Sequence, residues 1–256
     1  MDTAVGQVDV PAPRAHRGDG WRMVVRGIGQ LLITAGLVIL LFVVYELYGT
    51  GLYTQQQQNR LEQQLMLQWR NQPRTGTPAS PSVGHVPIGS GLAILRVPRF
   101  GSDWHMVVVE GTGYEDLKKG PGHYPGTALP GQVGNFAVAG HRTTYLAPFN
   151  RIDTLRPGDA IVLETRTMWF TYRVENIPPA TGYPHVPYQE IVDPSAVQVA
   201  YPVPDQPDPH LKPTLKLLTF TSCNPKYSAA QRIVVHALLV QSLKRGPGVV
   251  PPALEG

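Results

Sequence analysis

An apolar run near the N-terminus constrains this chain more than any other feature of its sequence. Ile28–Tyr48 reads IGQLLITAGLVILLFVVYELY, with Gln30, Thr34 and Glu46 as its only strongly polar members. An α-helix of about 20 residues measures roughly 30 Å, the hydrocarbon thickness of a bilayer. The run is longer than the apolar region of a signal peptide and ends in a poor cleavage site. We therefore predict a transmembrane signal anchor at 28–48, rather than a buried core helix or a cleaved signal peptide.

The charges that flank this run predict its orientation. Arginines precede it at positions 14, 17, 22 and 26, and Arg60 is the only basic residue soon after it. Because Lys and Arg concentrate on the cytoplasmic side of membrane helices, we expect a cytoplasmic tail at 1–27, a single pass through the cell membrane and an extracellular remainder. The net charge of +4 is modest, and no basic cluster with interleaved aromatic residues indicates nucleic-acid binding.

The remainder of the chain has the composition of a β-domain. The whole chain has 26 glycines and 26 prolines, about a fifth of its residues, against an average near 12%. With only 16% charged residues, this argues against a helical bundle or a coiled coil, while 42% hydrophobic residues suffice for a core. Segments rich in Val, Ile, Leu, Phe and Thr, separated by turn clusters, lie at Leu92–Val97, Met106–Glu110, Asn135–Ala139, Ala160–Thr165, Phe170–Glu175, Leu215–Thr221 and Ile233–Val240. We predict an all-β domain at 92–243, a barrel or sandwich of seven or eight strands with helical turns near Tyr114–Lys119 and Tyr145–Leu155.

The segment 49–91 connects the anchor to this domain. Leu52–Trp69 is rich in helix formers and places Leu61, Leu65 and Trp69 on one stripe. We predict a juxtamembrane helix there, which either continues from the membrane helix or packs on the folded domain. The part from Asn71 onward is rich in proline and glycine and reads as a linker.

Two further stretches lack periodicity. The stretch at 176–213 is long and carries many prolines, and a loop of that length inside a compact domain is more often functional than idle. The residues at 244–256 form a C-terminal tail.

The single cysteine, Cys223, is the first candidate for chemistry. One cysteine excludes an internal disulfide and a cysteine-only metal site within the chain. It follows the apolar run LKLLTFTS and precedes Asn224-Pro225, so we place it at the end of a strand, where a side chain is both held and exposed. From this alone the thiol is either a nucleophile or, as is common for a free cysteine, a small buried hydrophobe.

A thiol nucleophile needs a basic or cationic partner. His141 ends the strand Asn-Phe-Ala-Val-Ala and follows Gly140, which leaves its imidazole uncrowded, whereas the other histidines have no distinguishing setting. Arg232 begins the strand that follows Cys223. If these two strands are neighbours in the sheet, its guanidinium lies near the thiol, where it can orient a carbonyl or stabilise negative charge.

These residues carry a family resemblance. LLTFTSCNPKYSAAQRIVVHA resembles the sortase signature, a strand ending TLxTC followed by an arginine, and NFAVAGHR resembles the sortase histidine strand. The block GPGHYPGTALPGQVGNFAVAGHRTTYLAPFNRIDTLRPGDAIVLET is most similar to class E sortases, the housekeeping type of high-GC Gram-positive bacteria. The resemblance implies a closed β-barrel of about eight strands with short helices. It also assigns the three catalytic positions to His141, Cys223 and Arg232.

The resemblance also implies substrate-binding positions. Ser222 stands where the family usually has threonine, a change that keeps the hydroxyl. Tyr124 falls where class E enzymes use a tyrosine to choose Leu-Ala-x-Thr-Gly over Leu-Pro-x-Thr-Gly. Further residues expected to line the substrate groove are Thr221, Thr143, His123 and Asn135, and the stretch at 176–213 is expected to border it.

The function implied is that of a membrane-anchored cysteine transpeptidase. It would cleave a sorting motif of a secreted protein between Thr and Gly and join the protein to an amine of a peptidoglycan precursor. No cofactor is expected, and no metal site, because the acidic residues lack EF-hand-like spacing. The alternatives are a class D sortase, a pilin polymerase that uses a pilin lysine, and a noncatalytic, membrane-tethered wall-binding domain. An L,D-type cross-linker is disfavoured, because its arginine stands two residues past its cysteine.

Overall fold

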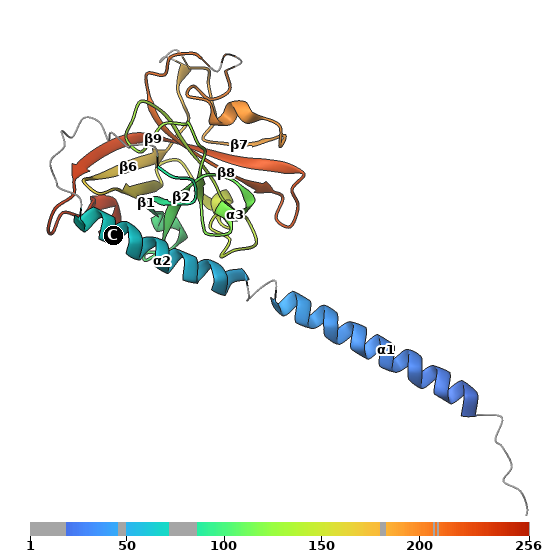
Figure 1. Ribbon diagram of the computed structural model, residues 1–256. Helices are drawn as coiled ribbons and strands as arrows, with labels where there is room; N and C mark the ends of the chain where they lie inside the picture. Colours follow the sequence, from blue (N-terminus) through green and yellow to red (C-terminus); the bar gives the residue numbers. More distant parts are fainter. Residues whose placement is uncertain are drawn as a thin grey trace, which may run out of the picture. The chain divides into compact units, whose positions relative to one another are not determined.

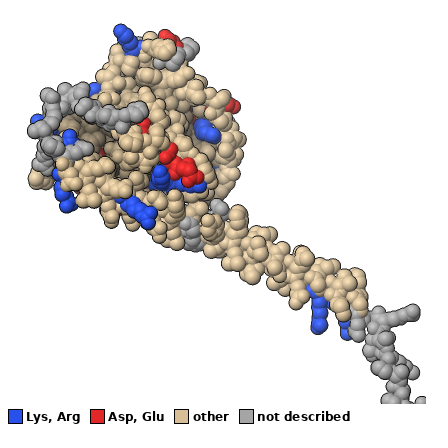
Figure 2. Space-filling view, in the orientation of Figure 1, with Lys and Arg blue, Asp and Glu red and all other residues tan. Residues whose placement is uncertain are grey.

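The computed structural model describes residues 19–45, 50–71, 86–179, 183–206, 208 and 210–255. The chain divides into two compact units, 1–46 and 47–256. The described part of the first unit is the helix α1 (Asp19–Val44), which by length and composition is suited to crossing a membrane. Its basic residues, Arg22 and Arg26, lie toward its N-terminal end (Figure 2). Most of the predicted cytoplasmic tail, the end of the predicted anchor and most of the predicted linker lie outside the described residues.

The second unit is a closed β-barrel (Figure 1). Its sheet runs in the order β6-β5-β1-β2-β3-β4-β8-β9-β7, and pairing of β6 with β9 closes eight strands into the barrel. β7 is attached to β9 outside that closed ring. The strands are β1 (Gly91–Arg96), β2 (His105–Glu110), β3 (Gly122–His123), β4 (Gly134–Ala139), β5 (Ala160–Glu164), β6 (Met168–Val174), β7 (Gln189–Val192), β8 (Lys216–Asn224) and β9 (Gln231–Lys244). The predicted barrel is therefore confirmed.

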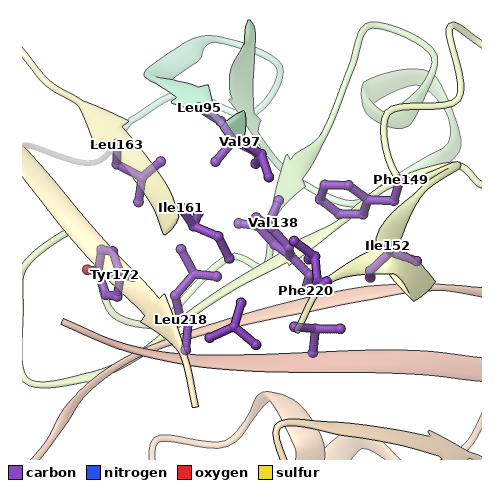
Figure 3. Packing of buried hydrophobic residues seen from close by; sticks show 14 of the residues in the cluster. Leu95, Val97, Val138, Phe149, Ile152, Ile161, Leu163, Tyr172, Leu218 and Phe220 are labelled. Atoms are coloured by element: carbon purple, nitrogen blue, oxygen red, sulfur yellow. The ribbon is translucent and has the colours of Figure 1, made fainter. Parts of the chain in front are cut away.

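The barrel interior holds the main hydrophobic core. Figure 3 shows part of it, with Leu163 and Tyr172 from β5 and β6 and with Val138 and Phe220 from β4 and β8. These side chains are fully buried. Because side chains along a strand alternate between the two faces, the inward position of these residues decides which of their neighbours point out of the barrel.

That alternation sets the outer face of β8. Leu218 and Phe220 belong to the core, so Thr219, Thr221 and Cys223 lie on the outer face. The parallel pairing of β4 with β8 and the antiparallel pairing of β8 with β9 extend this face to both sides. All three predicted catalytic residues are carried by these three strands or directly follow one of them.

Two helices accompany the barrel. The helix α2 (Thr50–Asn71) packs against β1 and β2, and the short helix α3 (Tyr114–Leu117) also packs against β2. Its Leu61 and Leu65 form a small apolar cluster with β1 and β2. Gln58 is buried in this contact, where its amide donates to the carbonyls of Val107 at 3.0 Å and Lys119 at 2.7 Å. Of the two alternatives for this helix, packing on the folded domain is therefore confirmed.

The structure adds elements that the sequence patterns did not indicate. The stretch predicted as an irregular loop contains β7 and the short 3-10 helix Val197–Ala200. The helical turn predicted at Tyr145–Leu155 is limited to the 3-10 helix Ile152–Thr154. The two-residue strand β3 was also not predicted. Another short helical turn, Pro252–Leu254, lies in the predicted C-terminal tail.

Candidate active site

Three neighbouring strands, β4, β8 and β9, place the predicted catalytic residues at the same height along the strand direction. Cys223 on β8 is the direct antiparallel partner of Arg232 on β9. Such partners lie about 5 Å apart at Cα and share a face of the sheet. On the other side of β8, Ala139 at the end of β4 pairs with Thr221. His141, two residues beyond Ala139, thus reaches the level of Cys223, two residues beyond Thr221.

His141 sits in a confined position. The N–H of the preceding Gly140 donates to the carbonyl of Thr221 at 3.1 Å, which extends the β4–β8 ladder. Gly140 needs its small size, because a Cβ there would lie 2.6 Å from the Phe149 ring. The His141 ring lies 5.1 Å from the Tyr145 ring, and its Nε2 is buried without a hydrogen-bond partner among the described residues. Burial lowers the pKa of His141 below its usual value of 6.5.

Cys223 and Arg232 are both partly exposed. The Arg232 guanidinium donates through Nη1 to the carbonyls of Ala229 at 3.0 Å and Gln231 at 2.9 Å. These carbonyls belong to the connection between β8 and β9 and to the start of β9. Contacts with the backbone fix the direction of a long side chain, so the arginine is held beside the strand end that carries the thiol.

A tyrosine and a threonine lie beside this row. The Tyr124 hydroxyl and the Thr221 Oγ1 are 2.9 Å apart. Thr221 lies on the same outer face as Cys223, two residues before it. The structure therefore brings Tyr124 to the strand that carries the cysteine, as expected for a residue that contacts substrate.

The other predicted substrate-binding residues differ in their surroundings. Ser222 is buried, and its hydroxyl donates to the Gly140 carbonyl at 2.8 Å. His123 is buried, with Nδ1 2.7 Å from the Glu110 carboxylate. Asn135 is buried and accepts a hydrogen bond from Thr219 at 2.8 Å. Thr143 is half-buried in the loop after His141. The contact of these four residues with substrate stays a prediction.

The sequence patterns missed Arg142. Its guanidinium is only 4% exposed and donates to the carbonyl of Cys223 at 3.2 Å. The feature of the sequence that could have pointed to Arg142 is its position directly after His141. Among the described residues no group of three or more His, Cys, Asp or Glu is placed to hold a metal ion.

Comparison with known proteins agrees with this geometry. A family described as "Sortase domain" matches residues 95–240. The chain is 34% identical over 230 residues to Sortase SrtE1 of Streptomyces coelicolor, which covers 87% of this chain and 59% of that protein. This chain belongs to the sortase family.

Solved structures place it more narrowly. Sortase E from Streptomyces avermitilis is 39% identical, with a TM-score of 0.55, over 66% of this chain and 99% of that one. The SrtF sortase from Corynebacterium diphtheriae is 35% identical, with a TM-score of 0.61, over 72% of this chain and 99% of that one. The chain resembles class E sortases. Since it spans 59% of SrtE1, the activity, substrates and partners of that whole protein carry over only as proposals.

Proposed function

We propose that this sortase cleaves a Leu-Ala-x-Thr-Gly-like or Leu-Pro-x-Thr-Gly-like motif between Thr and Gly and joins the protein to a cell-wall amine. The observation that supports this most is the row of His141, Cys223 and Arg232 at the ends of neighbouring strands. A nucleophile, a proton carrier and a cation at one level are what acyl transfer through a thioester requires.

In the first half-reaction Cys223 is the nucleophile. His141, kept neutral by burial at neutral pH, accepts the thiol proton as Sγ attacks the Thr–Gly carbonyl carbon. Arg232 stabilises the negative charge that develops on the carbonyl oxygen. As the C–N bond breaks, the imidazolium delivers that proton to the leaving glycine amine, and the Thr acyl group stays on Cys223 as a thioester.

In the second half-reaction an amine of a peptidoglycan precursor attacks the thioester. His141 accepts a proton from the amine and returns it to the departing thiolate, which restores the thiol. The thioester conserves the energy of the cleaved amide, so the exchange needs no ATP.

The membrane places enzyme and substrate together in this proposal. α1 is apolar along most of its length and has its basic residues toward the N-terminal end, consistent with a membrane anchor. We propose that the N-terminus lies in the cytoplasm and the barrel outside. Its partners would be secreted proteins with a C-terminal sorting motif, and residues 28–48 would contact the lipid bilayer.

The test uses the full-length protein in detergent with paired Leu-Ala-x-Thr-Gly and Leu-Pro-x-Thr-Gly peptides and a glycine-type amine. Mass spectrometry should detect the peptide cut after Thr and joined to the amine. Cys223→Ala should abolish both products while its melting temperature stays near that of the wild type. Substantial turnover by this variant would falsify the assignment of the nucleophile.

The paired peptides and the acceptor also separate the alternatives within the family. Faster turnover of the Leu-Ala-x-Thr-Gly peptide supports the class E preference proposed for Tyr124. Joining to a pilin-derived lysine peptide in place of the glycine-type amine would indicate a pilin polymerase. A wild-type protein that binds wall polymer, cuts neither peptide and has an inert thiol would indicate a noncatalytic domain.

A further inference from the structure

Arg142 is unusual for an arginine in this molecule. It directly follows His141, and no other lysine or arginine among the described residues is as deeply buried. Burying a guanidinium is costly unless polar partners surround it. The groups that contact the Arg142 guanidinium therefore identify the segments that this side chain holds together.

The guanidinium joins three segments around the active site. Nη1 donates to the carbonyl of Cys223 at 3.2 Å, and Nε donates to the carbonyl of Asn150, also at 3.2 Å. Nη2 lies 3.1 Å from Asp153 Oδ1, an ion pair without hydrogen-bond geometry. The Asn150 amide donates back to the carbonyl of Arg142 at 2.9 Å. One side chain thus links the end of β8 to both ends of the loop that begins at His141.

His141 is bracketed by two contacts with β8. The residue before it, Gly140, accepts a hydrogen bond from Ser222, and the residue after it, Arg142, donates to Cys223. Ser222 is in turn the neighbour of Cys223. His141 therefore lies between two cross-links, one to Ser222 and one to the backbone of Cys223, and together they fix the separation of the His141 and Cys223 backbones.

We propose that Arg142 is a positioning residue that keeps His141 within proton-transfer reach of Cys223. The proposal rests on the assignment of these two residues as the catalytic pair. Arg142 hydrogen-bonds the backbone carbonyl of Cys223, which is not one of the reacting atoms. Its effect is on geometry, and a misplacement of about 1 Å in a catalytic pair can cost about a hundredfold in rate.

The test compares Arg142→Gln, Arg142→Lys and the control Arg151→Gln in the full-length protein. Arg151 also donates to a backbone carbonyl, that of Phe100 at 2.8 Å, and lies nine residues further along the chain. We expect Arg142→Gln to lower kcat about 10- to 100-fold on the sorting peptide, with KM within about twofold of wild type. Arg142→Lys, which keeps the charge, should recover part of the loss, and Arg151→Gln should keep kcat.

The outcomes separate this inference from the proposed function. Wild-type protein that turns over no sorting peptide contradicts the proposed function. An active wild type with an Arg142→Gln variant of equal kcat, or with a loss confined to KM, contradicts the positioning role alone. If Arg142→Gln does not fold, Arg142→Lys decides: a folded variant with lowered kcat and unchanged KM supports the role, and one with wild-type kcat overturns it.

Discussion

His141 follows β4 and His236 lies on β9, the two strands on either side of β8, yet the surroundings of the two histidines differ. His236 on β9 is fully buried, with Nδ1 2.9 Å from the Thr219 hydroxyl and Nε2 3.3 Å from the Glu190 carboxylate. His141 is only partly buried, and its Nε2 has no hydrogen-bond partner among the described residues. One imidazole has both nitrogens engaged, and the other keeps one available.

This difference indicates that His236 has a structural role. The Thr219–His236–Glu190 chain links β8, β9 and β7, and Asp205 lies close to the same Glu190 carboxylate. Burial, with the neighbouring Glu190 charge, raises the pKa of Asp205. A satisfied buried network stabilises one arrangement of the backbone. An unpartnered buried nitrogen costs stability and marks a position kept for chemistry.

The largest expected effect comes from removing the available imidazole. His141→Ala should lower kcat about 10²- to 10⁴-fold, the usual contribution of a general acid–base, with little loss of stability. His236→Ala should keep kcat within about tenfold of the wild type in the folded fraction, because its nitrogens take no part in proton transfer. Steady-state kinetics on the sorting peptide measures both. Equal losses of kcat in the two variants would contradict the assignment of a catalytic role to His141 and a structural role to His236.

The second expected effect is on stability, where His236 should matter more than His141. His236→Ala removes the hydrogen bonds of the imidazole with Thr219 and Glu190 and opens a cavity, so it should cost about 2–4 kcal/mol of unfolding free energy. His105→Ala is the control, because His105 is exposed and should change stability by less than about 0.5 kcal/mol. Denaturant unfolding of the three proteins checks the order. A His236→Ala variant as stable as the control would mean that the network contributes nothing.

The sequence singled out His141 as the catalytic candidate, but it gave no sign of the hydrogen bonds of His236. Gly140, the strand before it and the family resemblance single out His141, and the two apolar runs with the Asn224-Pro225 turn after the first place Cys223 and Arg232 at strand ends. His236 lies in a uniformly apolar strand, and one of its two partners, Glu190, comes from β7, whose residues QEIV show no alternation. That strand forms through its pairing with β9, which tertiary structure supplies.

Arg142 was missed for a related reason. The acceptors of its hydrogen bonds are the backbone carbonyls of Cys223 and Asn150, and every residue carries a backbone carbonyl. A sequence pattern shows which side chains exist, but the burial of this arginine depends on parallel pairing of β4 with β8, more than seventy residues apart in the chain. The barrel as a class was predictable because its strands are patterned individually. Their order was implied only by the family resemblance.

The smallest expected effect is in the pH dependence of stability, and it tests the burial of His141 directly. Because burial lowers the pKa of His141 in the folded protein below 6.5, the unfolded chain binds more protons between the two values. The contribution is fully present above about pH 6.5 and is lost as pH falls through the folded value. The melting temperature of wild type minus that of His141→Asn should therefore fall as pH is lowered from 7 to 5. The partial exposure of the ring keeps the shift small. A difference that is constant, or that grows at low pH, would mean that His141 is as well hydrated as an exposed histidine and that its unpartnered nitrogen carries no cost.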